Sequence, residues 1–258
     1  MSGEDVEGIA EAVWRARQRG VYPEEWKGRL TLEVAYRVQL ALLDRYLASG
    51  ERQAGWKVGL TAPAIQRQVG IHEPVFGFLL ESGARASGAA VRFDELIRPA
   101  VENELCLTIG RPLEGRGVTL DAVRAAVSAV APALEIVEQR GDAAADVPLS
   151  IADNCQQRAF VVGPAAGPPA VSGDPATATV EVYLNGQLSE RASGAEVMGT
   201  PLASVAWLAE RLSRFGRRLE PGMRVMSGSF TRQYVVDEPR TDIEARFTPY
   251  GSARARFS

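Results

Sequence analysis

Glutamates are the residues of this 258-residue chain whose spacing is best suited to chemistry. Glu102 and Glu104 lie two residues apart in an alternating segment, so on a strand both carboxylates leave the same face with Cα atoms about 7 Å apart. Glu135 lies in a second apolar segment, Pro-Ala-Leu-Glu-Ile-Val-Glu. Carboxylates on a half-buried face repel one another unless a cation lies between them, and Mg²⁺ prefers such oxygen ligands. The spacing alone also fits two solvated surface glutamates, with Glu135 paired to an arginine.

Two basic side chains are further candidates. Lys57, one of only two lysines among 29 basic residues, lies between glycines and apolar residues in Gly-Trp-Lys-Val-Gly-Leu-Thr. A desolvated lysine near carboxylates can donate a proton or bind an anionic substrate, although the pattern also fits a surface lysine whose stem covers apolar residues. His72, the only histidine, lies in a predicted loop and fits either an exposed residue or a titrating group on a lid.

The composition excludes several other classes of site. Cys106 and Cys155 form no CxxC motif, so no thiolate zinc site is expected, and a single histidine excludes a multi-histidine metal site within one chain. The net charge of −3 gives no positive field for nucleic acid or a membrane surface. The apolar runs are far shorter than the roughly 18 residues that span a bilayer. The acidic N-terminus lacks an apolar signal core, which favours the cytoplasm.

The apolar pattern predicts the elements that position these residues. Three- and four-residue spacing predicts one helix that ends before Gly20 and a second that begins after the N-cap Thr31 and ends by Gly50. Alternation predicts half-buried strands over 56–60 and 100–109.

The second half of the chain is predicted to be largely β. Thr119 should begin an Ala/Val-rich helix that ends at Pro132, and a strand should follow from Ala133. Asn185-Gly186 has the composition of a two-residue hairpin turn. Because helices come first and a β body follows, we expect an α+β protein.

Five motifs, in order along the chain, make it similar to a known family. They are Gly-Trp-Lys-Val-Gly-Leu-Thr at 55–61, Arg-Pro-Ala-Val-Glu-Asn-Glu at 98–104, Pro-Ala-Leu-Glu-Ile-Val at 132–137, Ala-Asp-Asn at 152–154 and Ser-Gly-Ser-Phe-Thr-Arg at 227–232. The chain resembles the 2-keto-4-pentenoate hydratase / 4-oxalocrotonate decarboxylase family of the fumarylacetoacetate hydrolase superfamily. The resemblance implies an N-terminal helical segment (1–50), a mixed β-sandwich-like catalytic body (51–258) and assembly as a homo-oligomer.

The resemblance also implies a metal-dependent lyase. One Mg²⁺ or Mn²⁺ would bind Glu102, Glu104 and Glu135 and stabilise the enolate of a small 2-oxo or 2-hydroxy-dienoic acid, with Lys57 as the family lysine. A hydratase is the leading expectation and a decarboxylase the second. His72 is a further catalytic candidate. We expect the substrate contacts to come from the motifs at 152–157 and 227–232, through Asp153, Gln156, Ser229 and Thr231.

The chain departs from its relatives at two places. His72-Glu73-Pro74-Val75 replaces the usual Asp-Glu-Pro-Asp of the hydratases, and Cys155-Gln156-Gln157 replaces Ala-Ser and a small residue. We infer that the metal site is retained and the substrate pocket is altered. Two other readings stay open, namely a C–C hydrolase that uses His72 and Glu73 as an acid/base pair, and a catalytically silent binding or assembly relative.

Overall fold

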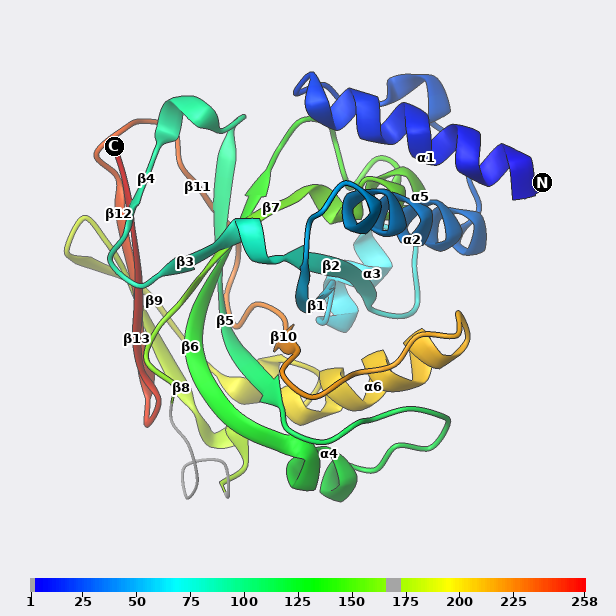
Figure 1. The fold of residues 1–258 in the computed structure, drawn as a ribbon. Coiled ribbons are helices and arrows are strands. Elements are labelled where there is room, and N and C mark those ends of the chain that lie inside the picture. Colours follow the sequence, from blue (N-terminus) through cyan, green and yellow to red (C-terminus); the bar gives the residue numbers. More distant parts are fainter. Residues whose placement is uncertain (1–2, 166–172) are drawn as a thin grey trace.

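The computed structural model describes residues 3–165 and 173–258, which form two packed β-sheets flanked by helices (Figure 1). The segment 165–176, whose Pro/Gly/Ala content predicts a loop, lies mostly outside these residues. The α+β expectation is confirmed. None of the helices in the described ranges is long and apolar enough to cross a membrane.

Two helices open the chain, α1 (Gly3–Gln18) and α2 (Leu32–Ala48). Thr31 caps α2 as predicted, because its Oγ1 accepts a hydrogen bond from the backbone N–H of Val34 at 3.3 Å. Buried residues of both helices belong to the same apolar cluster as the β body. The division of the chain at residue 50 stays a prediction.

The larger sheet has eight strands in the described part of the chain, in the order β2-β1-β10-β5-β6-β7-β3, with β11 paired to β5. Its strands are β1 (Gln53–Gly59), β2 (Val75–Leu80), β3 (Ala84–Ala86), β5 (Pro99–Ile109), β6 (Val127–Glu138), β7 (Gln157–Val162), β10 (Arg224–Met226) and β11 (Tyr234–Val235). The long antiparallel pair β5–β6 forms its centre and curves through the molecule (Figure 1).

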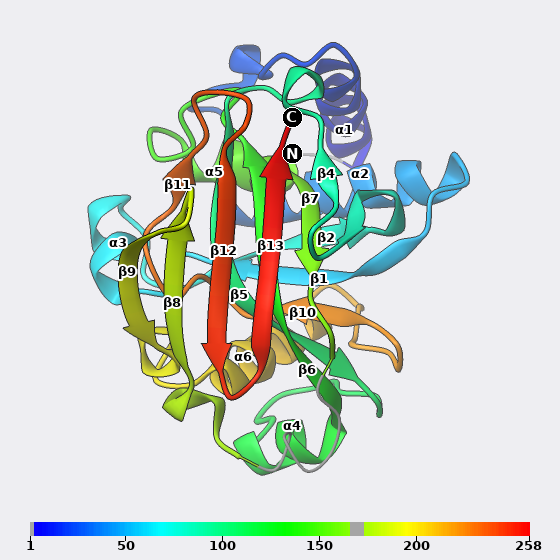
Figure 2. The same cartoon turned by 90° about the vertical axis from the view of Figure 1, so that its left-hand side faces the viewer.

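The second sheet has the order β4-β13-β12-β8-β9 and covers one face of the first (Figure 2). Its strands are β4 (Ala90–Val91), β8 (Thr179–Leu184), β9 (Gln187–Ser193), β12 (Asp242–Thr248) and β13 (Gly251–Phe257). The predicted hairpin turn joins β8 and β9, and its residues Asn185 and Gly186 have φ values of 49° and 79°. Positive φ at both positions is the requirement of a type I′ turn.

Of the remaining helices, α3 lies beside β1 and β2, and the others lie toward the two ends of the larger sheet (Figure 1). The α5 helix packs against α2 at one end, and α4 packs against α6 at the other. Their bounds are α3 (Pro63–Gln68), α4 (Leu120–Ala126), α5 (Val147–Ala152) and α6 (Pro201–Ser213).

Two expectations about these elements are wrong. The helix after Thr119 ends at Ala126 rather than Pro132, because residues 127–138 pair with β5 as strand β6. Pro132 lies one residue beyond Ala133, the last residue of β6 that pairs with β7. Its carbonyl accepts a hydrogen bond from the backbone N–H of Gly163 at 2.8 Å. Because the β6–β7 pairing ends there, the missing N–H of the proline removes no hydrogen bond from the sheet. The strands predicted to be half-buried, β1 and β5, are buried on both faces.

Candidate active site

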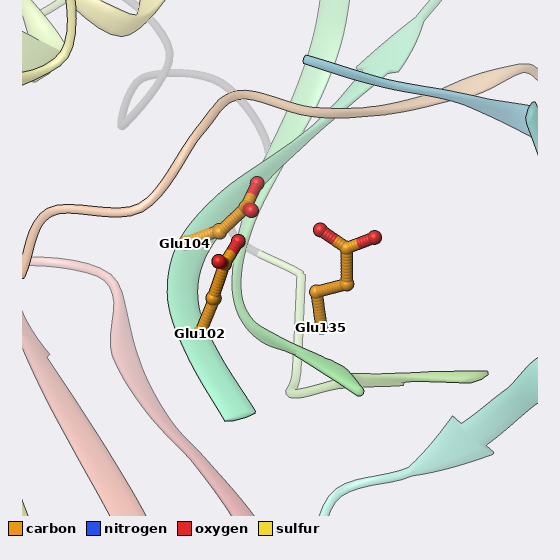
Figure 3. A group of neighbouring side chains, drawn as sticks. All are labelled: Glu102, Glu104 and Glu135. Carbon is orange, nitrogen blue, oxygen red and sulfur yellow. The ribbon is translucent and has the colours of Figure 1, made fainter. Parts of the chain in front are cut away.

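The three glutamates meet at the junction of β5 and β6. Glu102 and Glu104 leave the same face of β5, and Glu135 lies opposite Glu102 in the β5–β6 register (Figure 3). One carboxylate oxygen from each residue lies within 4.8 Å of the others. Glu104 and Glu135 are fully buried, whereas Glu102 is partly exposed. The convergence predicted from two separate strands is therefore present.

Lys57 completes this group from strand β1. Its side chain is only 5% exposed, and its Nζ lies 3.2 Å from Oε2 of Glu135. The surface-lysine alternative is therefore wrong, because both faces of β1 are covered. Burial alone would lower the pKa of Lys57, but Glu135 and the other two glutamates outweigh it and raise the pKa, so the ammonium stays charged.

The cluster carries more negative charge than Lys57 neutralises. Burial raises the pKa of Glu135 to about 7, although Lys57 opposes the shift. Burial, followed by the charges of Glu135 and Glu102, raises the pKa of Glu104 well above its ordinary value. The two raised pKa values have a common cause, since three carboxylates lie close together in a desolvated site with only one cation.

The unsatisfied oxygens of the cluster fit a hard divalent cation. Oε2 of Glu104 accepts from the backbone N–H of Gly228 at 2.7 Å, and Oε1 of Glu102 accepts from Nε2 of Gln233 at 3.0 Å. Oε1 of Glu104 and both carboxylate oxygens of Glu135 find no hydrogen-bond donor among the described residues, although Lys57 lies close to Glu135. Buried oxygens without donors are costly, and carboxylate oxygens are the ligands that Mg²⁺ and similar ions prefer. The donor set therefore fits such an ion.

A cavity of about 660 Å³ opens beside the cluster, and Lys57 and Glu102 are part of its wall. Gln156, which is predicted to contact the substrate, also lines the cavity. Its amide is held by Gly141, donating to the carbonyl and accepting from the N–H, both at 3.0 Å. Gln156 thereby fixes the loop that follows β6 to the segment that follows α5.

Asp153, expected to contact the substrate, lies off the wall of the cavity. It is fully buried, and its carboxylate accepts from Arg17 at 3.1 Å and from Arg140 at 2.8 Å. Burial still raises the pKa of Asp153, and the two arginines oppose the shift. Because both oxygens are engaged, Asp153 ties α1 to the segment that carries Gln156 rather than presenting a group to a ligand.

Two other expected contacts, Ser229 and Thr231, also lie outside the residues that line the cavity. Thr231 accepts from Nδ2 of Asn103 at 2.5 Å and donates to the carbonyl of Arg232 at 3.1 Å. The segment 227–232 contacts the cluster through its backbone instead, at Gly228. A side chain at that glycine would meet the side chain of Thr61 at 2.5 Å, so the close approach requires glycine.

His72 is exposed on the bend before β2 and lies outside the residues that line the cavity. Its neighbour Glu73 forms an ion pair with Arg211 of α6 at 2.8 Å. The lid acid/base pair of the hydrolase alternative is therefore not assembled beside the cluster, because Glu73 is held by Arg211 and His72 faces solvent.

Sequence reasoning missed two glutamines at the site. Nε2 of Gln139 donates to Oε1 of Gln233 at 3.0 Å, and Gln233 in turn donates to Glu102. Both glutamines line the cavity. Neither glutamine belongs to a recognisable sequence pattern. The one sequence feature that could have indicated them is their position, since Gln139 lies two residues after the motif at 132–137 and Gln233 lies one residue after the motif at 227–232.

Comparisons with known proteins identify the family of the chain. The family model described as fumarylacetoacetate (FAA) hydrolase C-terminal matches residues 54–258. A 2-hydroxyhexa-2,4-dienoate hydratase of Comamonas testosteroni is 39% identical over 203 residues, which cover 78% of this chain and 76% of the relative. A 4-oxalocrotonate decarboxylase of Pseudomonas putida is 33% identical over 239 residues, which cover 92% of this chain and 87% of the relative.

A solved structure extends the similarity to the whole chain. The 4-oxalocrotonate decarboxylase from Pseudomonas putida G7, complexed with magnesium and adipate, superposes with a TM-score of 0.93 at 32% identity, covering 100% of this chain and 99% of that one. The N-terminal helices are thus part of the shared fold. The chain belongs to the fumarylacetoacetate hydrolase family and is a relative of its 2-keto-4-pentenoate hydratases and 4-oxalocrotonate decarboxylases.

Proposed function

We propose that this protein is a Mg²⁺- or Mn²⁺-dependent lyase of the hydratase type that acts on a small 2-hydroxy-dienoic or 2-oxo acid. The observation that carries the proposal is the approach of Glu102, Glu104 and Glu135 to within 4.8 Å beside the buried Lys57, at the wall of a cavity. The hydratases and decarboxylases among its relatives support the same assignment.

The residues of the chain have distinct parts in this reaction. A divalent ion held by the three carboxylates would supply Lewis-acid polarisation of the 2-oxo group. The ammonium of Lys57 offsets the negative charge that develops on the 2-oxygen, and the low exposure of this side chain strengthens that interaction. Gln233 holds Glu102 in place through its amide.

Hydration of 2-hydroxypenta-2,4-dienoate takes place in two steps. The 2-hydroxyl loses its proton and C5 gains one, which gives a 2-oxo acid with a C3–C4 double bond. Water then adds its oxygen to C4 and a proton to C3. Negative charge collects on the 2-oxygen in both steps, so Lys57 serves both.

A decarboxylase is the second candidate. It is favoured by the full-length superposition on a 4-oxalocrotonate decarboxylase and by Val75, an apolar residue on the cavity wall where the hydratases usually have an aspartate. Loss of CO₂ would leave an electron pair that is delocalised onto the same 2-oxygen. The two reactions differ in whether the product gains water or loses CO₂.

The test follows the loss of dienol absorbance from 2-hydroxypenta-2,4-dienoate with protein and Mg²⁺. A hydratase converts this substrate into a product that is heavier by one water. The decarboxylase alternative is tested separately with 2-hydroxymuconate, from which a decarboxylase releases CO₂. Lys57→Met should lower kcat by about 100-fold or more, the scale of positioned acid and electrostatic catalysis.

The chain offers a matched control, because its other lysine lies on the surface. Lys27 is 52% exposed and lies 3.9 Å from Glu24, so Lys27→Met should leave kcat unchanged. A Lys57→Met variant with the kinetics of the parent would contradict the assigned role. Absence of turnover on either substrate by metal-loaded protein would contradict the proposed function.

A further inference from the structure

The cavity is large and mainly apolar beyond Lys57 and Glu102. Its volume of about 660 Å³ lies within the roughly 300–1,000 Å³ of pockets that hold drug-sized ligands, and a five-carbon acid is far smaller. Six aliphatic side chains contribute to its wall, namely Leu60, Val69, Val75, Val137, Val147 and Ile151. A further aliphatic residue, Ile65 of α3, lines the cavity while it is 43% exposed. Such a surface favours a hydrocarbon group.

The acidic groups of the outer wall already have partners. Glu138 lies within 3.5 Å of both Arg140 and Arg158. Oδ1 of Asp142 accepts from the backbone N–H groups of residues 144 and 145, both at 3.1 Å. A second substrate carboxylate that entered this region would therefore face the acids Glu138 and Asp142 without gaining a free buried cation.

Three glutamine amides of the wall, those of Gln139, Gln156 and Gln233, are similarly engaged. Gln156 is bonded to Gly141, and Gln139 is bonded to Gln233. Arg98 is the only cation besides Lys57 among the described residues that line the cavity, and it is solvent-exposed. An exposed pair between Arg98 and a carboxylate would contribute little, because both ions remain hydrated.

We infer that the substrate is a monocarboxylic 2-oxo or 2-hydroxy-dienoic acid whose tail is an uncharged hydrocarbon longer than a vinyl group, and that acids with a second terminal carboxylate are disfavoured. This inference rests on the proposed function, because it takes the carboxylate end of the substrate to lie at Lys57. It favours the hydratase assignment, since the substrate of an oxalocrotonate-type decarboxylase carries two carboxylates.

The test measures binding rather than turnover, by calorimetry of three saturated 2-oxo acids with the Mg²⁺-loaded protein. 2-Oxohexanoate has two more methylenes than 2-oxobutanoate and should bind roughly fifteenfold more tightly, at about fourfold for each buried methylene. 2-Oxoadipate has the same chain length as 2-oxohexanoate but ends in a carboxylate, and it should bind at least tenfold more weakly. Equal or tighter binding of 2-oxoadipate overturns the inference.

A variant at the exposed position Ile65 tests the wall itself. Ile65→Lys removes an apolar group from the cavity wall without disturbing a buried residue, so 2-oxohexanoate should lose about threefold in affinity. An exposed ammonium attracts a carboxylate only weakly, so the affinity of 2-oxoadipate should change by less than about twofold. Ile65→Leu, the matched control, should keep the order of the parent. An Ile65→Lys variant with the parent's affinities for both acids overturns the inference.

Failure of this inference is distinguishable from failure of the proposed function. Hydration of 2-hydroxypenta-2,4-dienoate together with preferred binding of 2-oxoadipate would retain the function and overturn the tail preference. Absence of turnover together with the expected order of binding would overturn the function and retain the apolar subsite.

Discussion

Glu104→Gln gives a direct measure of the charge imbalance in the carboxylate cluster. The substitution preserves the side-chain shape and an oxygen that can accept from Gly228. It replaces the other oxygen, which has no donor, by an amide nitrogen that can donate to Glu135. It therefore removes one buried titratable carboxyl group while it leaves the packing of β5 intact.

The pH dependence of this effect follows from the raised pKa of Glu104. The folded protein holds the Glu104 proton to a higher pH than the unfolded chain, whose pKa lies near the ordinary value of 4.5. The metal-free parent therefore loses stability as the pH rises from 4.5 toward the folded pKa, by up to about 1.4 kcal/mol per pH unit. Glutamine does not titrate, so the free energy of unfolding of the variant relative to the parent should increase by up to about 2.7 kcal/mol between pH 5.5 and 7.5.

A divalent ion should offset this difference in stability. Mg²⁺ at about 100 times its Kd stabilises a protein that binds it only when folded by about 2.7 kcal/mol. The parent should show this gain at pH 7.5, and Glu104→Gln should lose most of it. The assay is urea unfolding after treatment with a chelator, with and without added Mg²⁺.

The control for this measurement is Glu138→Gln. Glu138 is also buried, but it pairs with Arg140 and Arg158 outside the cluster. This variant should be less stable than the parent and should keep the full Mg²⁺ gain. The reasoning would be refuted if metal-free Glu104→Gln were less stable than the parent at pH 7.5 and retained the parent's response to Mg²⁺.

Three further outcomes are expected. Gln233→Ala should weaken Mg²⁺ affinity by about tenfold in calorimetry, because Glu102 loses the donor that orients it, and an unchanged affinity would exclude that role. His72→Ala should leave kcat/KM within about twofold in the dienol assay, whereas a large loss would show that this exposed histidine takes part in catalysis. Arg17→Met should cost about 3 kcal/mol in urea unfolding by leaving the buried Asp153 with one arginine, and a cost below about 1 kcal/mol would show that Arg140 suffices.

The sequence predicted those elements that depend on interactions between residues close together in the chain. The Thr31 cap and the turn at Asn185 depend on hydrogen bonds and φ angles within four residues, so composition identifies them. The helix after Thr119 was predicted too long, since its Ala/Val-rich second half is equally suited to a strand and pairing with β5 decides between them. Alternation likewise cannot reveal that both faces of β1 and β5 are buried in the folded chain.

The site residues also divide into those that local sequence predicts and those that only the folded structure reveals. Glu102 and Glu104 are predictable because strand spacing alone puts them on one face, and the motif order added Glu135 and Lys57. The pairing of Asp153 could not be predicted, because one of its partners, Arg17, lies 136 residues away in the sequence, and only the folded chain shows that its oxygens are engaged. Assembly as a homo-oligomer stays a prediction.

The central claim is that three glutamates of β5 and β6 hold one divalent ion beside Lys57. The most direct test is an anomalous difference map from crystals of the protein grown with Mn²⁺ at pH 7.5. The account predicts one strong peak per chain, about 2.0–2.3 Å from oxygens of Glu102, Glu104 and Glu135, which is absent in Glu104→Gln. A map without a peak between these residues, or with its strongest peak elsewhere in the chain, would contradict it.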